Sequence, residues 1–221
     1  MKKLNRLFAA AVLPFTLPMA IEQWTPVHLP SRELPEVESK DGEWHIVTHG
    51  GAGGYAYLLP EPGLEKDPRM KISWRWSVLK FPKTNPSVPF DKKNDDYALR
   101  VGVLIADTDE NIKVPASIEK LLKAKGVKLS YVVFYNTVGS KTGASACGIS
   151  PYNDYIVNCL KHATDREKLE SASPIEDAMK HFGLPEAESE KLKIIGVWIF
   201  ADSDNSNSES EAKLNRIQFL K

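Results

Sequence analysis

Two acidic pairs and one arginine have the residue types and spacing that could bind a polar ligand. Asp95 and Asp96 stand shortly before Arg100 in one stretch of the chain, and Asp202 and Asp204 follow a second apolar stretch near the C-terminus. Carboxylates accept hydrogen bonds from hydroxyl groups, and a guanidinium can bind a carboxylate through two parallel hydrogen bonds. Together, such side chains could recognise a polyhydroxylated or an acidic ligand.

A second group, Trp74, Arg75 and Trp76, also has binding chemistry. In an extended strand successive side chains point to opposite faces, so the two tryptophans share one face and Arg75 lies on the other. Indole rings can stack on the C–H face of a sugar, and arginine can orient a carboxylate. The alternatives are that the tryptophans fill the core and that Arg75 joins a structural ion-pair cluster with the acidic residues.

The same carboxylates could serve two further kinds of chemistry. Hydrolysis of a polysaccharide needs two carboxylates that face each other across the bond, and Asp95, Asp96 and Asp202 supply them without fixing their separation. Asp202 and Asp204 could instead ligate calcium through oxygen atoms. The twelfth position of that segment is Lys213 rather than glutamate, which excludes an EF-hand, and a solvated turn is the alternative.

Other familiar sites are not indicated. The glycine run over residues 50–54 lacks the Gly-Lys-Ser/Thr ending and the following helix of a phosphate-binding loop, so we expect a flexible strand connection there. His45 and His49 would lie about 13 Å apart on a strand, too far to share one zinc ion. No Gly-x-Ser-x-Gly nucleophile motif is present.

The elements that must position these residues are mostly strands. Patterns of alternating or continuous apolar residues predict strands over 43–49, 55–59, 72–78, 95–105, 129–135, 152–160, 193–200 and 214–220. Helices are predicted over 116–125 and from 174 onward, ending at Gly126 and Gly183. Because β-α-β alternation is absent, we predict a mainly β, jelly-roll-type β-sandwich with two short helical insertions; an α+β domain is the alternative.

The N-terminus has the pattern of a secretory signal peptide. Lys2, Lys3 and Arg6 precede an apolar stretch that ends at Ala20, and this stretch is too short and too interrupted by proline to span a bilayer. A buried N-terminal helix is the alternative. We therefore predict a periplasmic or secreted protein with no transmembrane segment in the mature chain, an extended lead-in over 21–41 and a single domain over 42–221.

The charge of the chain limits its possible binding partners, and its cysteines bear on whether it forms a disulfide. The 29 basic and 29 acidic residues balance, so the chain carries no basic surface for nucleic acid. Cys147 and Cys159 are the two cysteines, and in an oxidising compartment they could form a disulfide worth roughly 3 kcal/mol. Two unpaired thiols are the alternative, and the sequence does not fix the oligomeric state.

Five motifs in order carry a resemblance to a known family: ISWRW at 72–76, DDYALRV at 95–101, LSYVVF at 129–134, FG at 182–183 and ADSDN at 201–205. Over roughly 44–219 their order and spacing resemble domain-of-unknown-function family 3047, found in exported bacterial proteins. The resemblance implies a periplasmic sandwich related to galactose-binding-like and carbohydrate-binding modules, and it implies no particular activity. The segment 109–127, with its lysine-rich helix, departs from the family pattern and looks inserted.

The sequence thus predicts an exported, non-catalytic binding module for a glycan or another polyhydroxylated or acidic ligand. Tryptophans 74 and 76 would stack on the ligand, Arg75 and Arg100 would orient it, and Asp95, Asp96 and Asp202 would accept its hydrogen bonds. The alternatives are an enzyme that acts on polysaccharide with these carboxylates, and a structural protein of the envelope in which the charged cluster only joins strands.

Overall fold

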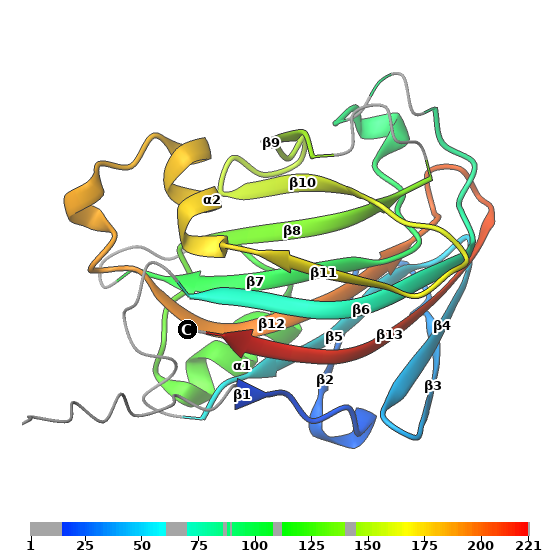
Figure 1. Ribbon diagram of the computed structural model, residues 1–221, viewed down its shortest axis with the longest axis horizontal. Coiled ribbons are helices and arrows are strands. Elements are labelled where there is room, and N and C mark those ends of the chain that lie inside the picture. Colours follow the sequence, from blue (N-terminus) through cyan, green and yellow to red (C-terminus); the bar gives the residue numbers. More distant parts are fainter. Residues whose placement is uncertain are drawn as a thin grey trace, which may run out of the picture.

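The computed structural model describes residues 15–60, 70–85, 88, 90–107, 112–139 and 145–220. These residues form two β-sheets stacked face to face, with helix α2 at one end of the strands (Figure 1). The first sheet has the order β11 (Lys168–Ala172), β6 (Lys71–Lys80), β13 (Glu209–Leu220), β4 (Glu43–His49), β3 (Glu36–Lys40), and β1 (Phe15–Thr16) also pairs with β13.

The second sheet has seven strands and carries the candidate site. Its order is β2 (Thr25–His28), β5 (Ala52–Leu58), β12 (Lys193–Asp202), β7 (Arg100–Ala106), β8 (Tyr131–Val138), β10 (Ile156–His162), β9 (Cys147–Ile149). Strands β8 and β10 pair in parallel, and the other recorded pairs are antiparallel. The helices are α1 (Ala116–Lys125), α2 (Pro174–Phe182), and the short 3-10 turns η1 (Ile21–Gln23), η2 (Lys92–Asn94), η3 (Glu186–Glu188). The mainly β, jelly-roll-type sandwich with two short helices is therefore confirmed.

The core lies between the two sheets and follows from the period of two in strand β6. Its inward side chains are all at most 2% exposed: Ile72, Trp74, Trp76, Val78. Strand β12 is buried on both faces, as its continuous apolar run predicts, because Val197 and Ile199 face this core while Trp198 and Phe200 face outward. The outward residues join a second apolar cluster that is covered by Ile118 and Leu122 of α1.

Both α-helices end where the sequence predicts. Gly126 and Gly183 take left-handed φ angles of 66° and 65°, which glycine adopts without a steric penalty. The residue at the N-cap of α1 is Pro115. Helix α1, within the segment that departs from the family pattern, covers the outer face of the second sheet beside β2 and β5.

Several predicted elements need correction. The stretch predicted as one strand over 95–105 begins only at Arg100, because residues 95–99 form the loop that leads into β7. The predicted lead-in over 21–41 contains β2 and β3, which pair with β5 and β4. The predicted strands over 129–135 and 152–160 start later, at Tyr131 and Ile156, and the edge strands β9 and β11 were not predicted.

Part of the glycine run is strand rather than flexible connection. Ala52, Gly53 and Gly54 form the start of β5 beside β12. A Cβ atom on Gly54 would lie 1.9 Å from the Ile199 carbonyl oxygen, so this position needs glycine for the close approach of the two backbones.

The predicted signal peptide lies largely outside the described residues, which begin at Phe15. From there the chain packs on the sandwich: β1 pairs with β13, and the Met19 carbonyl oxygen accepts hydrogen bonds from Trp44 Nε1 at 2.6 Å and Ser39 Oγ at 2.8 Å. The boundary at residue 20 and the exported location stay predictions. In the described part of the chain, no helix is long and apolar enough to cross a membrane.

Candidate functional site

A pocket of about 440 Å³ opens on the outer face of the second sheet. Its floor is apolar and buried, formed by Phe134 of β8 with Trp198 and Phe200 of β12. The aromatic side chain of Tyr152, 57% exposed, stands at its rim. The polar residues of the lining come mostly from loops around that floor: Arg32, Asp95, Lys113, Ser150, Asn153, Asp202, Asp204, Asn205.

One buried ion-pair cluster lies in the pocket lining. Arg100 Nη2 donates hydrogen bonds to Asp202 Oδ2 at 2.5 Å, to Asp95 Oδ2 at 3.2 Å and to the Asp95 carbonyl oxygen. All three side chains are less than 10% exposed. Burial lowers the pKa of Arg100, but the carboxylates of Asp202 and Asp95 outweigh it and raise that pKa above its ordinary value, so the guanidinium stays charged.

Burial and the neighbouring charges also shift the pKa of Asp202 in this cluster. Burial raises the pKa of Asp202, the Arg100 guanidinium opposes the rise, and the neighbouring Asp95 carboxylate adds to it. Two buried carboxyl groups thus share one guanidinium, and the raised pKa of Asp202 favours its protonated form, which balances the charge of the cluster.

Aromatic rings hold the Arg100 guanidinium in place. Its central carbon lies 4.5 Å from the ring centre of Tyr97, 5.3 Å from that of Phe200 and 5.9 Å from that of Phe134. Arginine commonly packs over such rings, which attract its charge. Since Phe134 and Phe200 also form the floor, the cluster and the apolar floor are one packed unit.

Asp202 and Asp96 also hold the loops around the pocket in place. Asp202 Oδ1 accepts the backbone N–H of Tyr97 at 2.8 Å, which fixes the loop before β7. The two carboxylate oxygens of Asp96 accept the N–H groups of Asn205 and Ser206 at 3.1 and 2.7 Å.

The structure therefore brings together five of the eight predicted site residues: Asp95, Asp96, Arg100, Asp202, Asp204. They meet because β7 and β12 are neighbours in the second sheet, so the start of one lies beside the end of the other.

The other three predicted residues lie elsewhere, and their predicted role is corrected. Trp74 and Trp76 are enclosed between the two sheets, where neither ring can present a face to a ligand, so the core alternative describes them. Arg75 lies on the outer face of the first sheet and forms an ion pair with Glu167 at 2.7 Å. It cannot reach Asp96 or Asp202, because β6 and β7 belong to different sheets.

The acidic cluster also bears on the predicted calcium. Ligand atoms of Asp96, Asp202 and Asp204 lie within 4.8 Å of one another. Their oxygens already accept backbone N–H groups or contact arginine, including Arg32 Nε, which lies 2.6 Å from Asp204 Oδ2. A cation would compete with those contacts, and calcium at Asp202 and Asp204 stays a prediction.

The residues that the sequence did not single out are the aromatic floor and the rim. Phe134, Trp198 and Phe200 lie in strands whose two faces are both apolar, so their pattern does not distinguish a pocket floor from a core. The sequence pattern places Tyr152 in a predicted strand, and its exposure is evident only in the fold.

The fold and the site define a β-sandwich protein with a polar-rimmed aromatic pocket on the outer face of one sheet. The chain belongs to the family described as "Protein of unknown function (DUF3047)", whose model matches residues 22–218. A search of curated proteins finds no match to the sequence.

Several solved structures are similar to this chain. The Family 11 Carbohydrate-Binding Module from Clostridium thermocellum, in complex with a β-1,3-1,4-mixed-linked tetrasaccharide, has a TM-score of 0.46 and 10% identity, over 96% of this chain and 97% of that one. The xyloglucanase domain of NopAA from Sinorhizobium fredii, in complex with cellobiose, has a TM-score of 0.45 and 12% identity, over 89% of this chain and 90% of that one. Endoglucanase 3 from Trichoderma harzianum, of family GH12, has a TM-score of 0.39 and 11% identity, over 96% of this chain and 98% of that one.

Proposed function

We propose that this protein binds a neutral glycan in the pocket on the outer face of the second sheet. The observation that carries the proposal is the combination of a buried aromatic floor with a surrounding set of carboxylate, amide and hydroxyl groups. A sugar ring has the matching character, since its C–H face packs on aromatic rings and its hydroxyl groups hydrogen-bond at the edge. The volume, about 440 Å³, falls within the range of about 300–1,000 Å³ found for small-molecule sites.

Three buried polar atoms of the lining residues support a ligand that can both donate and accept hydrogen bonds. Asp95 Oδ1, Arg100 Nε and Trp198 Nε1 have no hydrogen-bond partner among the described residues. A buried polar group without a partner costs stability. A hydroxyl group can serve as donor to the first atom and as acceptor to either of the other two.

The charge of the site favours a neutral over an acidic ligand. Arg100 is buried and its charge is already paired with the carboxyl groups of Asp95 and Asp202, so it offers an anionic ligand little net attraction. Arg32, the second arginine of the lining, is paired with Asp204. The three cationic side chains of the lining, Arg32, Arg100 and Lys113, are matched by three aspartates, so the site has no net positive charge that would attract an anion.

The arrangement supports binding rather than hydrolysis. Glycoside hydrolysis uses two carboxyl groups that flank the scissile bond. Asp95 and Asp202 instead contact the same atom, Arg100 Nη2, and thus enclose a protein side chain rather than a substrate.

Replacing Tyr152 with alanine is expected to weaken glycan binding about tenfold, or about 1.4 kcal/mol. This ring stands at the pocket rim, where its removal takes away apolar contact without disturbing the core. The measurement is titration calorimetry with cellotetraose and with a mixed-linkage β-glucan tetrasaccharide, after thermal unfolding has identified which neutral oligosaccharide raises the midpoint. Galacturonate oligomers serve as the acidic comparison and should leave the midpoint unchanged.

The matched control is Tyr155→Ala. Tyr155 is exposed to a similar extent, 44%, and is not part of the pocket lining. If both variants weaken binding equally, or if acidic oligomers raise the midpoint more than neutral ones do, the proposed site or the proposed ligand class is wrong.

A further inference from the structure

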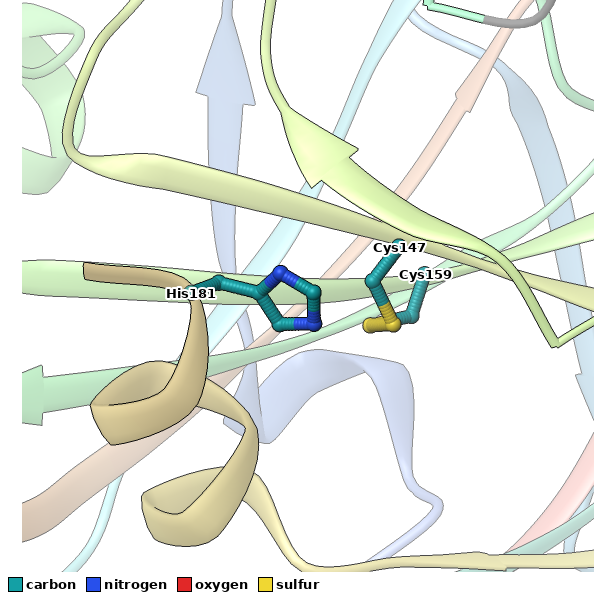
Figure 2. Close-up of side chains that lie close together, drawn as sticks. All are labelled: Cys147, Cys159 and His181. Atoms are coloured by element: carbon teal, nitrogen blue, oxygen red, sulfur yellow. A yellow bond between two sulfur atoms is a disulfide. The ribbon is translucent and has the colours of Figure 1, made fainter. Parts of the chain in front are cut away.

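A disulfide and an imidazole share a small cavity at the other edge of the second sheet. Cys147 of β9 lies directly opposite Cys159 of β10, and their sulfur atoms are bonded. The ring of His181, from α2, points toward the two sulfur atoms (Figure 2). One ring nitrogen and both sulfur atoms lie within 4.8 Å of one another, and all three residues line a cavity of about 170 Å³.

The place of the disulfide leaves one of its two sulfur atoms more open to attack. Strand β9 has three residues, lies at the end of the sheet and pairs with β10 through three residue pairs. Cys147 is partly exposed, whereas Cys159 is 2% exposed. An incoming nucleophile therefore reaches Cys147 first.

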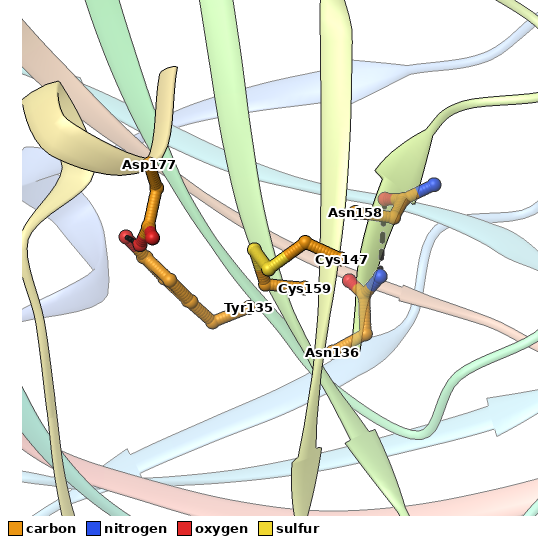
Figure 3. Close-up of a disulfide and its surroundings, with 6 residues drawn as sticks. All are labelled: Tyr135, Asn136, Cys147, Asn158, Cys159 and Asp177. Atoms are coloured by element: carbon orange, nitrogen blue, oxygen red, sulfur yellow. Dashed lines mark hydrogen bonds between the residues drawn. A yellow bond between two sulfur atoms is a disulfide. The ribbon is translucent and has the colours of Figure 1, made fainter. Parts of the chain in front are cut away.

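The charges around the cavity favour a thiolate. Lys161 and Lys180 line it together with His181, and positive groups nearby stabilise a thiolate over a thiol. The acidic residue of the lining, Asp177, accepts a hydrogen bond from the Tyr135 hydroxyl at 2.7 Å, beside the disulfide (Figure 3). Burial and this carboxylate raise the pKa of Tyr135 well above its usual value, so the phenol keeps its proton and continues to donate it to Asp177.

The His181 ring lies where the leaving thiolate would form. One of its ring nitrogens is within 4.8 Å of both sulfur atoms, and the residue lies one helical turn after Asp177 on α2. A protonated imidazole can donate a proton to a thiolate or form an ion pair with it. His181 is therefore placed to meet the thiolate that leaves when the disulfide opens.

We propose that Cys147, Cys159 and His181 form a thiol–disulfide exchange site for a dithiol reductant, either a small dithiol or the dithiol of a reductase. A thiolate of the reductant attacks Cys147 Sγ and forms a mixed disulfide with it. The Cys147–Cys159 bond breaks, and its electron pair leaves on Cys159 Sγ, which His181 protonates or holds as an ion pair. The second thiolate of the reductant then attacks the reductant's other sulfur, the one bonded to Cys147 Sγ. This step releases the oxidised reductant and the Cys147 thiolate.

The first test compares the rate of reduction with the rate of unfolding. The folded full chain is treated with dithiothreitol well below its melting temperature, and new thiols are counted by alkylation and mass spectrometry. We expect reduction at least tenfold faster than global unfolding, which is measured separately by denaturant-jump kinetics. A disulfide that opens only at the unfolding rate would overturn the proposal.

The second test separates the role of His181 from simple access. At one pH and one concentration of dithiothreitol, we expect His181→Gln to slow reduction about tenfold without changing the rate of global unfolding. His28→Gln, on the exposed edge strand β2 of the same sheet, is the control and should change neither rate. An unchanged rate of reduction in His181→Gln would overturn the assignment.

The third test asks which sulfur is attacked. The folded protein is treated briefly with reduced glutathione, a single thiol that stays on the sulfur it attacks, free thiols are alkylated, and mass spectrometry locates the bound glutathione. We expect glutathione on Cys147 at least tenfold more often than on Cys159. Equal labelling, or the reverse order, would contradict the proposed direction of attack.

Discussion

Replacing Arg100 with methionine is expected to lower the free energy of unfolding by roughly 3–5 kcal/mol. The change leaves Asp95 and Asp202 buried without the guanidinium that they share, and burying an unpaired charge is costly. It also removes the cation from among the rings of Tyr97 and Phe200. Urea unfolding of the variant and the unchanged protein, with a linear extrapolation to water, measures the difference.

The control for this prediction is Arg75→Met on the other sheet. Its ion pair with Glu167 is exposed, and such pairs contribute about 0–1 kcal/mol. If the two variants lose similar stability, burial of the Arg100 cluster does not determine its contribution, and that account of the site is wrong.

Replacing Trp74 with alanine is expected to cost roughly 3–5 kcal/mol of stability, because it opens a large cavity between the two sheets. The indole is fully buried, and its ring centre lies 5.2 Å from that of Trp76 and 5.1 Å from that of Tyr135. Loss of this ring removes contacts to both sheets at once. Denaturant unfolding again gives the free energy, and the variant should bind glycan unchanged under conditions in which it stays folded.

Leu169→Ala provides the comparison, since Leu169 is a large apolar residue of β11 that is 57% exposed. Exposed substitutions of this kind usually change stability by about 0.5 kcal/mol or less. A Trp74→Ala variant that is as stable as Leu169→Ala, or that loses glycan binding while remaining folded, would restore the stacking role first expected for this tryptophan.

The elements best predicted from the sequence are those whose pattern is local. The alternation in β6, the apolar run in β12 and the glycine stops of both helices each depend on a short stretch of residues. The strands β9 and β11 are different, since three to five partly exposed residues at a sheet edge carry little hydrophobic signal. Their conformation comes from the neighbouring strand.

The site was predictable in its residue types but not in its neighbours. Arg100 and Asp202 could be named because a guanidinium and a carboxylate have the chemistry to bind a polar ligand, yet only the pairing of β7 with β12 brings them together. The same limit explains Arg75, whose strand lies in the opposite sheet. The apolar floor of the pocket could not be told from core, because a strand buried on both faces gives one continuous apolar pattern.

The hairpin of β9 and β10 has a consequence for the order of assembly. The cross-link joins residues only 12 apart, wholly within this hairpin. Chain ends about that far apart meet within roughly 10–100 ns, long before distant partners such as Glu43 and Asn215 of β4 and β13 can find each other. The two thiols can thus meet while most of the sandwich is still unformed. Because disulfide formation itself takes seconds to hours, the hairpin closes before it docks beside β8 only where an oxidant acts faster than the two sheets assemble.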